Sequence, residues 1–250
     1  MGSTFVAAAC FCIVSAVMLS AGASDMRRRE VPDIHWKAVF AVGIPCSALV
    51  MAESFPVPAV LLAACSSVFM ALHALSDALP WWASLPASGA LAAASYLSAS
   101  GTPGGWMLLA PFSSSALFLL MYHSRLLVGG ADAKALISMS SMPQHPSAQG
   151  LPLLWQAGWP MSAVPLSVSV LLVAAVLSLA PMSLVGARNL REGRACARML
   201  TERRMPLDEA RASFVWPCED APEGAVVRRR VTEGEKEAYD RLERAGAEDV

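Results

Sequence analysis

The chain has 250 residues, of which 55% are apolar, and its formal net charge at pH 7 is −1. The charges are unevenly distributed, because 13 of the 19 basic residues and 14 of the 20 acidic residues lie at or after Arg188. A soluble domain could not cover the surface of residues 1–187 with so few charges. We therefore expect residues 1–187 to lie in a membrane and residues 188–250 to lie in water. No basic patch predicts binding to nucleic acid.

The first apolar segment, 4–24, is long enough to cross a membrane, and it ends in small residues as a cleavable signal peptide does. No basic residue precedes the segment, whereas Arg27, Arg28 and Arg29 follow it. Basic residues collect on the cytoplasmic side of membrane proteins. We therefore interpret the segment as a retained first span whose N-terminus lies outside.

Further apolar segments follow in chain order. Because about 20 apolar residues cross the hydrocarbon layer, spans are predicted at 36–52, 56–75, 79–98 and 105–124, then a short segment at 133–143 and a long one at 159–186. The expected fold is an all-α polytopic membrane protein of about seven transmembrane helices. Alternating crossings put the basic residues at or beside the cytoplasmic side, in agreement with the positive-inside rule.

The last quarter of the chain differs in character. We expect a membrane domain over 1–187 and a cytoplasmic tail or small subdomain over 188–250. Within the tail, 189–204 and 233–246 have helix-forming compositions with charges of both signs, and prolines interrupt the middle. The six cysteines form no Cys-x-x-Cys pair and the four histidines have no ligand spacing, so neither a metal nor another cofactor is expected.

Two aspartates lie where the predicted topology meets the cytoplasmic face. Asp25 ends the first span, and Asp132 lies between the fifth span and the short segment. Ionisable side chains at membrane depth are costly and mark functional sites. Two carboxyl groups that share a site hold a proton between them and can activate water against a peptide carbonyl. The preceding Gly129 and Gly130 permit backbone conformations closed to other residues and let a substrate strand approach closely.

Each feature taken alone also has an ordinary structural explanation. Asp25 would cap the end of a helix and pair with Arg28 or Arg29. The residues around Asp132 would form a surface loop, and Lys134 would extend its ammonium group to the interface. The catalytic interpretation depends on both aspartates occurring in this topology.

The two motifs together resemble those of the GxGD aspartyl proteases, specifically the type IV prepilin peptidases and the archaeal preflagellin peptidases. In that family a first Asp at a helix end is followed by a basic run and an Ile/Val-Pro-Asn/Asp element, which residues 25–33 match. The second Asp lies in a Gly-x-Gly-Asp-x-Lys element, which residues 129–134 match except for Ala131 at the third position. Compared with the compact archaeal members, two spans are added between the motifs. This even number keeps Asp132 on the same side.

The resemblance implies a multi-pass aspartic endopeptidase of the cell membrane that faces the cytoplasm, with Asp25 and Asp132 as its catalytic pair. The supporting motif residues would be Gly129, Gly130, Ala131 and Lys134. Its partners would be the surrounding lipid and precursors with class III signal peptides, namely archaellins and type IV pilins. Two other classes stay open: a transporter or channel subunit that uses both aspartates as a proton or cation relay, and an inactive scaffold for pilus assembly. A relay places its acids at mid-membrane.

Overall fold

The structure, a computed structural model, describes residues 2–28, 30–76, 80–127, 129–143, 165–191, 200, 205–212, 221, 226 and 235–247. Every regular element in these ranges is a helix, as the sequence predicts. The chain forms two compact units, Met1–Val173 and Ala174–Val250. Arg29 and the beginning of the segment expected at 159–186 lie outside the described residues.

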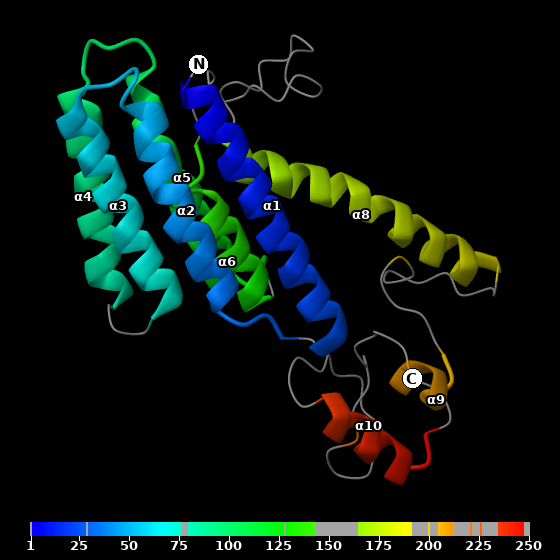
Figure 1. Cartoon of the computed structure of the whole chain (residues 1–250). Helices are drawn as coiled ribbons and strands as arrows, with labels where there is room; N and C mark the ends of the chain where they lie inside the picture. Colours follow the sequence, from blue (N-terminus) through cyan, green and yellow to red (C-terminus); the bar gives the residue numbers. More distant parts are fainter. Residues whose placement is uncertain are drawn as a thin grey trace. The chain divides into compact units, whose positions relative to one another are not determined.

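The first unit is built from helices that follow one another in alternating directions (Figure 1). They are α1 (Gly2–Arg28), α2 (Ile34–Met51), α3 (Val57–Leu75), α4 (Trp81–Ser98), the short 3-10 helix η1 (Gly105–Leu109), α5 (Ala110–His123) and α6 (Gly130–Met139). The last turns of α1, α3 and α5 and the first turns of α2, α4 and α6 therefore lie at one end of the bundle. We call this end, which contains Asp25 and Asp132, the motif end.

Five described helical segments are long and apolar enough to cross a membrane. They are Thr4–Arg28, Ile34–Met51, Val57–Leu75, Gly105–His123 and Leu166–Arg191, the last of which is α8. The two further spans expected at 79–98 and 133–143 are helices, but they do not meet this standard. α4 has 18 residues, and its serines, prolines and tryptophans lower its hydropathy, while α6 has only 10 residues.

Serine hydroxyls hold α4 against α3. Ser66 and Ser88 each donate a hydrogen bond of 2.9 Å to the other's carbonyl oxygen, and Ser95 donates one of 2.6 Å to the carbonyl oxygen of Ala59. Small side chains let two helix backbones approach closely, and such contacts bring helices together inside membranes. The fully buried positions of α4 are accordingly all small: Ser84, Ser88, Ala92 and Ser95.

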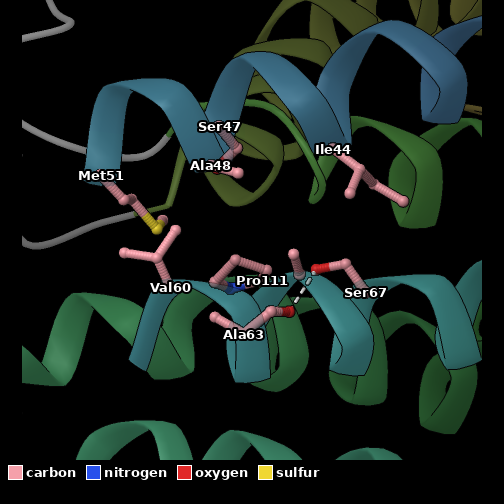
Figure 2. A pocket seen from close by; sticks show the side chains of 9 residues that line it. Ile44, Ser47, Ala48, Met51, Val60, Ala63, Ser67 and Pro111 are labelled. Carbon is pink, nitrogen blue, oxygen red and sulfur yellow. Dashed lines mark hydrogen bonds between the residues drawn. The ribbon is translucent and has the colours of Figure 1, made fainter. Parts of the chain in front are cut away.

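Three apolar clusters are buried in the bundle, and two of them fill its opposite halves. Toward the motif end, buried side chains come from α2, α3, α5 and α6: Phe40, Met70, Ala71, Phe118, Leu119, Leu136 and Ile137. The other half is filled by Met51, Phe55, Ala59, Val60, Ala63, Ala99, Met107 and Leu108. A small pocket in this second half lies between α2, α3 and α5, with Ile44, Val60 and Pro111 among its lining residues (Figure 2). It therefore lies apart from the two aspartates.

The second unit contains a small folded core. Its helices are the remainder of α8, α9 (Leu207–Ala212) and α10 (Glu235–Arg244). Tyr239 and Leu242 of α10 are buried against Leu207 and Ala210 of α9. Arg211 binds two carboxylates of α10, Asp240 at 2.8 Å and Glu243 at 2.9 Å. The helix predicted at 233–246 is confirmed, and the described residues at the start of 189–204 belong to the last turn of α8. The boundary between the two units falls inside α8.

The seam between α3 and α4 can be tested by overpacking. Ser88 is 0% exposed, so Ser88→Leu is expected to lower the free energy of unfolding by about 1–3 kcal/mol. Ser98→Leu is the matched control, because Ser98 is exposed and its hydroxyl bonds within its own helix, to the carbonyl oxygen of Ala94. Reversible unfolding in mixed micelles measures both. Equal destabilisation by the two variants would contradict the close packing of α4 against α3 at Ser88.

Candidate functional site

Asp25 lies in the last turn of α1, and its side chain is exposed at the motif end. Among the described residues it forms no ion pair with Arg27 or Arg28. The ordinary explanation of Asp25 as the ion-pair partner of Arg28 is therefore not realised in this structure. Its carboxylate is open to water and to a bound chain.

The backbone that follows Asp25 is held by side chains from both neighbouring helices. Ser24 donates a hydrogen bond of 3.0 Å to the carbonyl oxygen of Glu30. The ring of His35 spans α1 and α2, because its Nδ1 lies 3.0 Å from the carbonyl oxygen of Pro32 and its Nε2 lies 3.2 Å from the hydroxyl of Ser20. These contacts fix the connection between the first span and the second.

Asp132 lies in the first turn of α6, directly after Gly129. Its carboxylate folds back over this glycine, so that a Cβ atom on Gly129 would lie 2.5 Å from Oδ2 and 3.1 Å from Cγ of Asp132. Gly129 does not use the backbone freedom of glycine, because it has φ −87° and ψ 120°, which any residue can adopt. Gly129 is required because its missing side chain leaves room for the carboxylate.

Gly130 and Ala131 have less restrictive surroundings. A Cβ atom on Gly130 would lie 3.7 Å from the phenolic oxygen of Tyr122, an ordinary contact distance. Gly130 is the first residue of α6, so it does not use the backbone freedom of glycine either. Ala131 is helical and half-buried, which suits an alanine. Tyr122, at the end of α5, is a neighbour of the motif that the sequence analysis missed.

The charges of Asp25 and Asp132 interact. The pKa of the Asp132 carboxyl group is raised above its ordinary value of 3.8, first by partial burial and second by the negative charge of Asp25. Asp132 lies outside the five candidate spans. The two aspartates that the sequence singles out are thus close enough for the charge of Asp25 to act on Asp132.

Lys134 connects the second motif to the first. Its Nζ atom lies 2.7 Å from Oδ1 of Asp33, and the two side chains are 34% and 40% exposed. Asp33 precedes α2 at the capping position, but its side chain makes no capping hydrogen bond. The sequence analysis counted Asp33 only as part of a motif. The sequence nevertheless indicates that this ion pair is possible, because the two motifs contain opposite charges at the same end of the predicted bundle.

A second contact fixes α6 at its other end. A Cβ atom on Gly43 of α2 would lie 2.6 Å from the hydroxyl oxygen of Ser141 and 3.3 Å from its carbonyl oxygen. Next to it, Ser140 donates a hydrogen bond of 3.0 Å to the hydroxyl of Ser167 at the beginning of α8. The segment that carries Asp132 is therefore attached near both of its ends.

Comparison of the chain with known protein families, with curated proteins and with solved structures gives no match. The case for the site therefore depends on its own residues. Two neighbouring carboxyl groups, one with a raised pKa, can hold a proton at one group while the other accepts a proton from water.

The raised pKa predicts how stability depends on pH. An acid whose pKa is higher in the folded state keeps its proton longer there, so the folded state loses stability as pH rises above the unfolded-state value, about 3.9 for Asp. Asp132→Asn stays neutral at every pH and avoids this loss. We expect its thermal unfolding midpoint to exceed that of the wild type at pH 7, with the difference vanishing near pH 3.

The control for this comparison is Asp208→Asn, which removes an exposed carboxylate of α9. Thermal unfolding in detergent, repeated between pH 3 and pH 8, measures all three proteins. A midpoint for Asp132→Asn that lies below the wild-type midpoint at pH 7 would show that the ionised carboxylate stabilises the fold.

Proposed function

We propose that the chain is a membrane-embedded aspartic endopeptidase that cuts the class III signal peptides of archaellin or type IV pilin precursors. The observation that carries the proposal is the electrostatic interaction of Asp25, in the last turn of α1, with Asp132, in the first turn of α6. Each of these aspartates lies in a motif that resembles the corresponding motif of prepilin and preflagellin peptidases. The resemblance supplies the substrate class.

The proposed topology puts the N-terminus outside the cell and the motif end at the cytoplasmic face of the cell membrane. Arg27 and Arg28 follow the first span directly, which favours this orientation by the positive-inside rule. If α4 and α6 enter the membrane with the five candidate spans, the total is the expected number of about seven. The precursor would be cut just before its hydrophobic helix, after a short basic leader.

The proposed reaction uses one water and two carboxyl groups. Asp25 takes a proton from the water while the water oxygen attacks the peptide carbonyl carbon, and Asp132 gives its proton to the carbonyl oxygen. The tetrahedral intermediate then collapses: the nitrogen receives the proton held by Asp25, the C–N bond breaks, and the hydroxyl returns a proton to Asp132. The assignment of the acid to Asp132 follows from its raised pKa.

The position of the two carboxylates favours a peptidase over a relay. Both side chains are exposed, and both lie at helix ends, Asp25 in the last turn of α1 and Asp132 in the first turn of α6. A peptide can approach such a pair from water. A proton or cation relay requires acids near the middle of the membrane, and the described acids of the first unit lie at or beyond helix ends.

Replacement of either aspartate tests the chemistry. Asp25→Asn and Asp132→Asn should each abolish precursor cleavage while the protein still accumulates in the membrane, because Asn keeps the shape of the side chain but cannot exchange a proton. Glu53→Gln, which changes an exposed acid beyond the opposite end of α2, should cleave like the wild type. The measurement is N-terminal sequencing of precursors after co-expression and in detergent assays.

Cleavage that survives in Asp25→Asn or in Asp132→Asn would refute the two-carboxyl reaction. Chelators are expected to leave the rate unchanged, and inhibition by a chelator that the matching metal ion reverses would require a different chemistry. Proton or cation flux through reconstituted vesicles that both substitutions abolish, with no cleavage, would favour the relay.

The two neighbouring glycines offer a sharper pair of variants. Gly129→Ala puts a methyl group where the Asp132 carboxylate lies, so the carboxylate must move. Gly130→Ala makes only an ordinary contact with Tyr122. Since a misplacement of about 1 Å in a catalytic group can lower activity on the order of 100-fold, Gly129→Ala should lose that much in kcat. Gly130→Ala should stay within about threefold. Similar rates for both variants would contradict the role of Gly129.

A further inference from the structure

Lys134 is a cation close to a pair of carboxylates, yet it binds a third one. It lies two positions after Asp132 in α6, and residues at this spacing point to different sides of a helix. The Lys134 ammonium lies 2.7 Å from Asp33 at the start of α2. Asp132 is influenced instead by Asp25 of α1. One short helix thus presents its anion and its cation to two different partners.

The consequence of this separation follows from electrostatics. A cation within about 4–6 Å of an Asp lowers the pKa of that Asp by about 1–3 units, because it stabilises the ionised form. If the Lys134 ammonium lay beside Asp132, it would favour the ionised form of this carboxyl group. Asp132 would then be less able to supply a proton to the carbonyl oxygen. The long, flexible lysine side chain can make this move once its partner is removed.

We propose that Asp33 is a positioning residue that holds the ammonium group of Lys134 away from Asp25 and Asp132, so that these two carboxyl groups keep one proton between them. Its catalytic consequence rests on the proposed function. The separation of charges itself is a property of the folded chain and can be tested without a substrate. In this assignment Lys134 is not a substrate-binding cation, because its charge is already neutralised within the protein.

Other titratable groups face this region from the elements around α6. The described ones are Asp25, Arg27 and Arg28 of α1, Glu30 of the connection, Asp33, His35 and Lys37 at α2, His73 of α3, and Tyr122, His123 and Arg125 at the end of α5. Of these, Asp25 is the one whose charge raises the pKa of Asp132. His73 lies 3.0 Å from the hydroxyl of Ser84. The described start of α8 carries no ionisable side chain.

The test measures protonation of Asp132 directly. Dicyclohexylcarbodiimide reacts with protonated carboxyl groups, so mass spectrometry of the full-length protein in micelles gives the fraction of Asp132 modified at each pH. Asp33→Asn should move the midpoint of modification to lower pH by about one unit. The double variant Asp33→Asn/Lys134→Gln, which removes the released cation, should return the midpoint to the wild-type value or above it.

Three further variants make the result specific. Asp33→Glu keeps the charge and should leave the midpoint in place. Asp33→Ser removes the charge but keeps a residue that caps helices well, so it should shift the midpoint as Asp33→Asn does even if Asn disturbs α2. Lys37→Gln removes an exposed lysine from the same helix and should have no effect. Precursor cleavage that requires a protonated Asp132 should also be lost at a lower pH in Asp33→Asn than in the wild type.

The inference is overturned if the neutral variants at Asp33 leave the midpoint unchanged or raise it, or if the double variant behaves like Asp33→Asn. These outcomes are separable from those for the proposed function. A wild-type chain that cuts no precursor, but whose Asp132 midpoint responds as expected, refutes the peptidase and retains the separation of charges. If the wild-type chain cuts precursors, but substitutions at Asp33 do not shift the pH midpoint of Asp132 modification, only the role of Asp33 is refuted.

Discussion

The attachment of α6 to α2 is the constraint on which the candidate site depends. α6 has only 10 residues, and four of them are buried against the bundle: Ala133, Leu136, Ile137 and Ser138. The ion pair between Lys134 and Asp33 is partly exposed, and such pairs contribute at most about 1 kcal/mol. The close approach of Gly43 to Ser141 supplies the steric part of the attachment. Together a directional contact and a close-packed one define where the first turn of α6 lies, and therefore where Asp132 lies.

Hydroxyl groups have a similar positioning role in the rest of the bundle. A buried hydroxyl without a partner is costly in an apolar environment, so each serine in a helix interface restricts how its helix can rotate. Ser66 and Ser88 satisfy each other across α3 and α4, and Ser140 and Ser167 do so between α6 and α8. The energy of each bond in a membrane is modest, about 1 kcal/mol. Their combined effect is to select one arrangement of helices that are otherwise uniformly apolar.

The sequence predicts the positions of individual helices better than their contacts. The spans expected at 36–52 and 56–75 agree with α2 and α3 within two residues at each end, because uninterrupted apolar runs between turn residues define them. Counting alternate crossings also predicted that Asp25 and Asp132 share one end. The partner of Lys134 could not be predicted, because pairing between residues far apart in the chain depends on the rotation of each helix. The role of Gly129 was predicted from its usual backbone freedom, whereas the structure assigns it to the space that its missing side chain leaves.

The serine-rich seam of α4 has a consequence for how the chain enters the membrane. A segment of 18 residues rich in Ser, Ala and Trp partitions into lipid less readily than its neighbours, since partitioning follows hydrophobicity. Four of its buried positions are small side chains that contact α3 or the adjacent bundle, and its hydroxyls bond to α3. In lipid, α4 is therefore more stable when it is packed against α3 than when it is alone. If α4 crosses the membrane as proposed, we expect α3 to remain beside the translocation channel until α4 emerges, so that the two helices enter the lipid together as a hairpin.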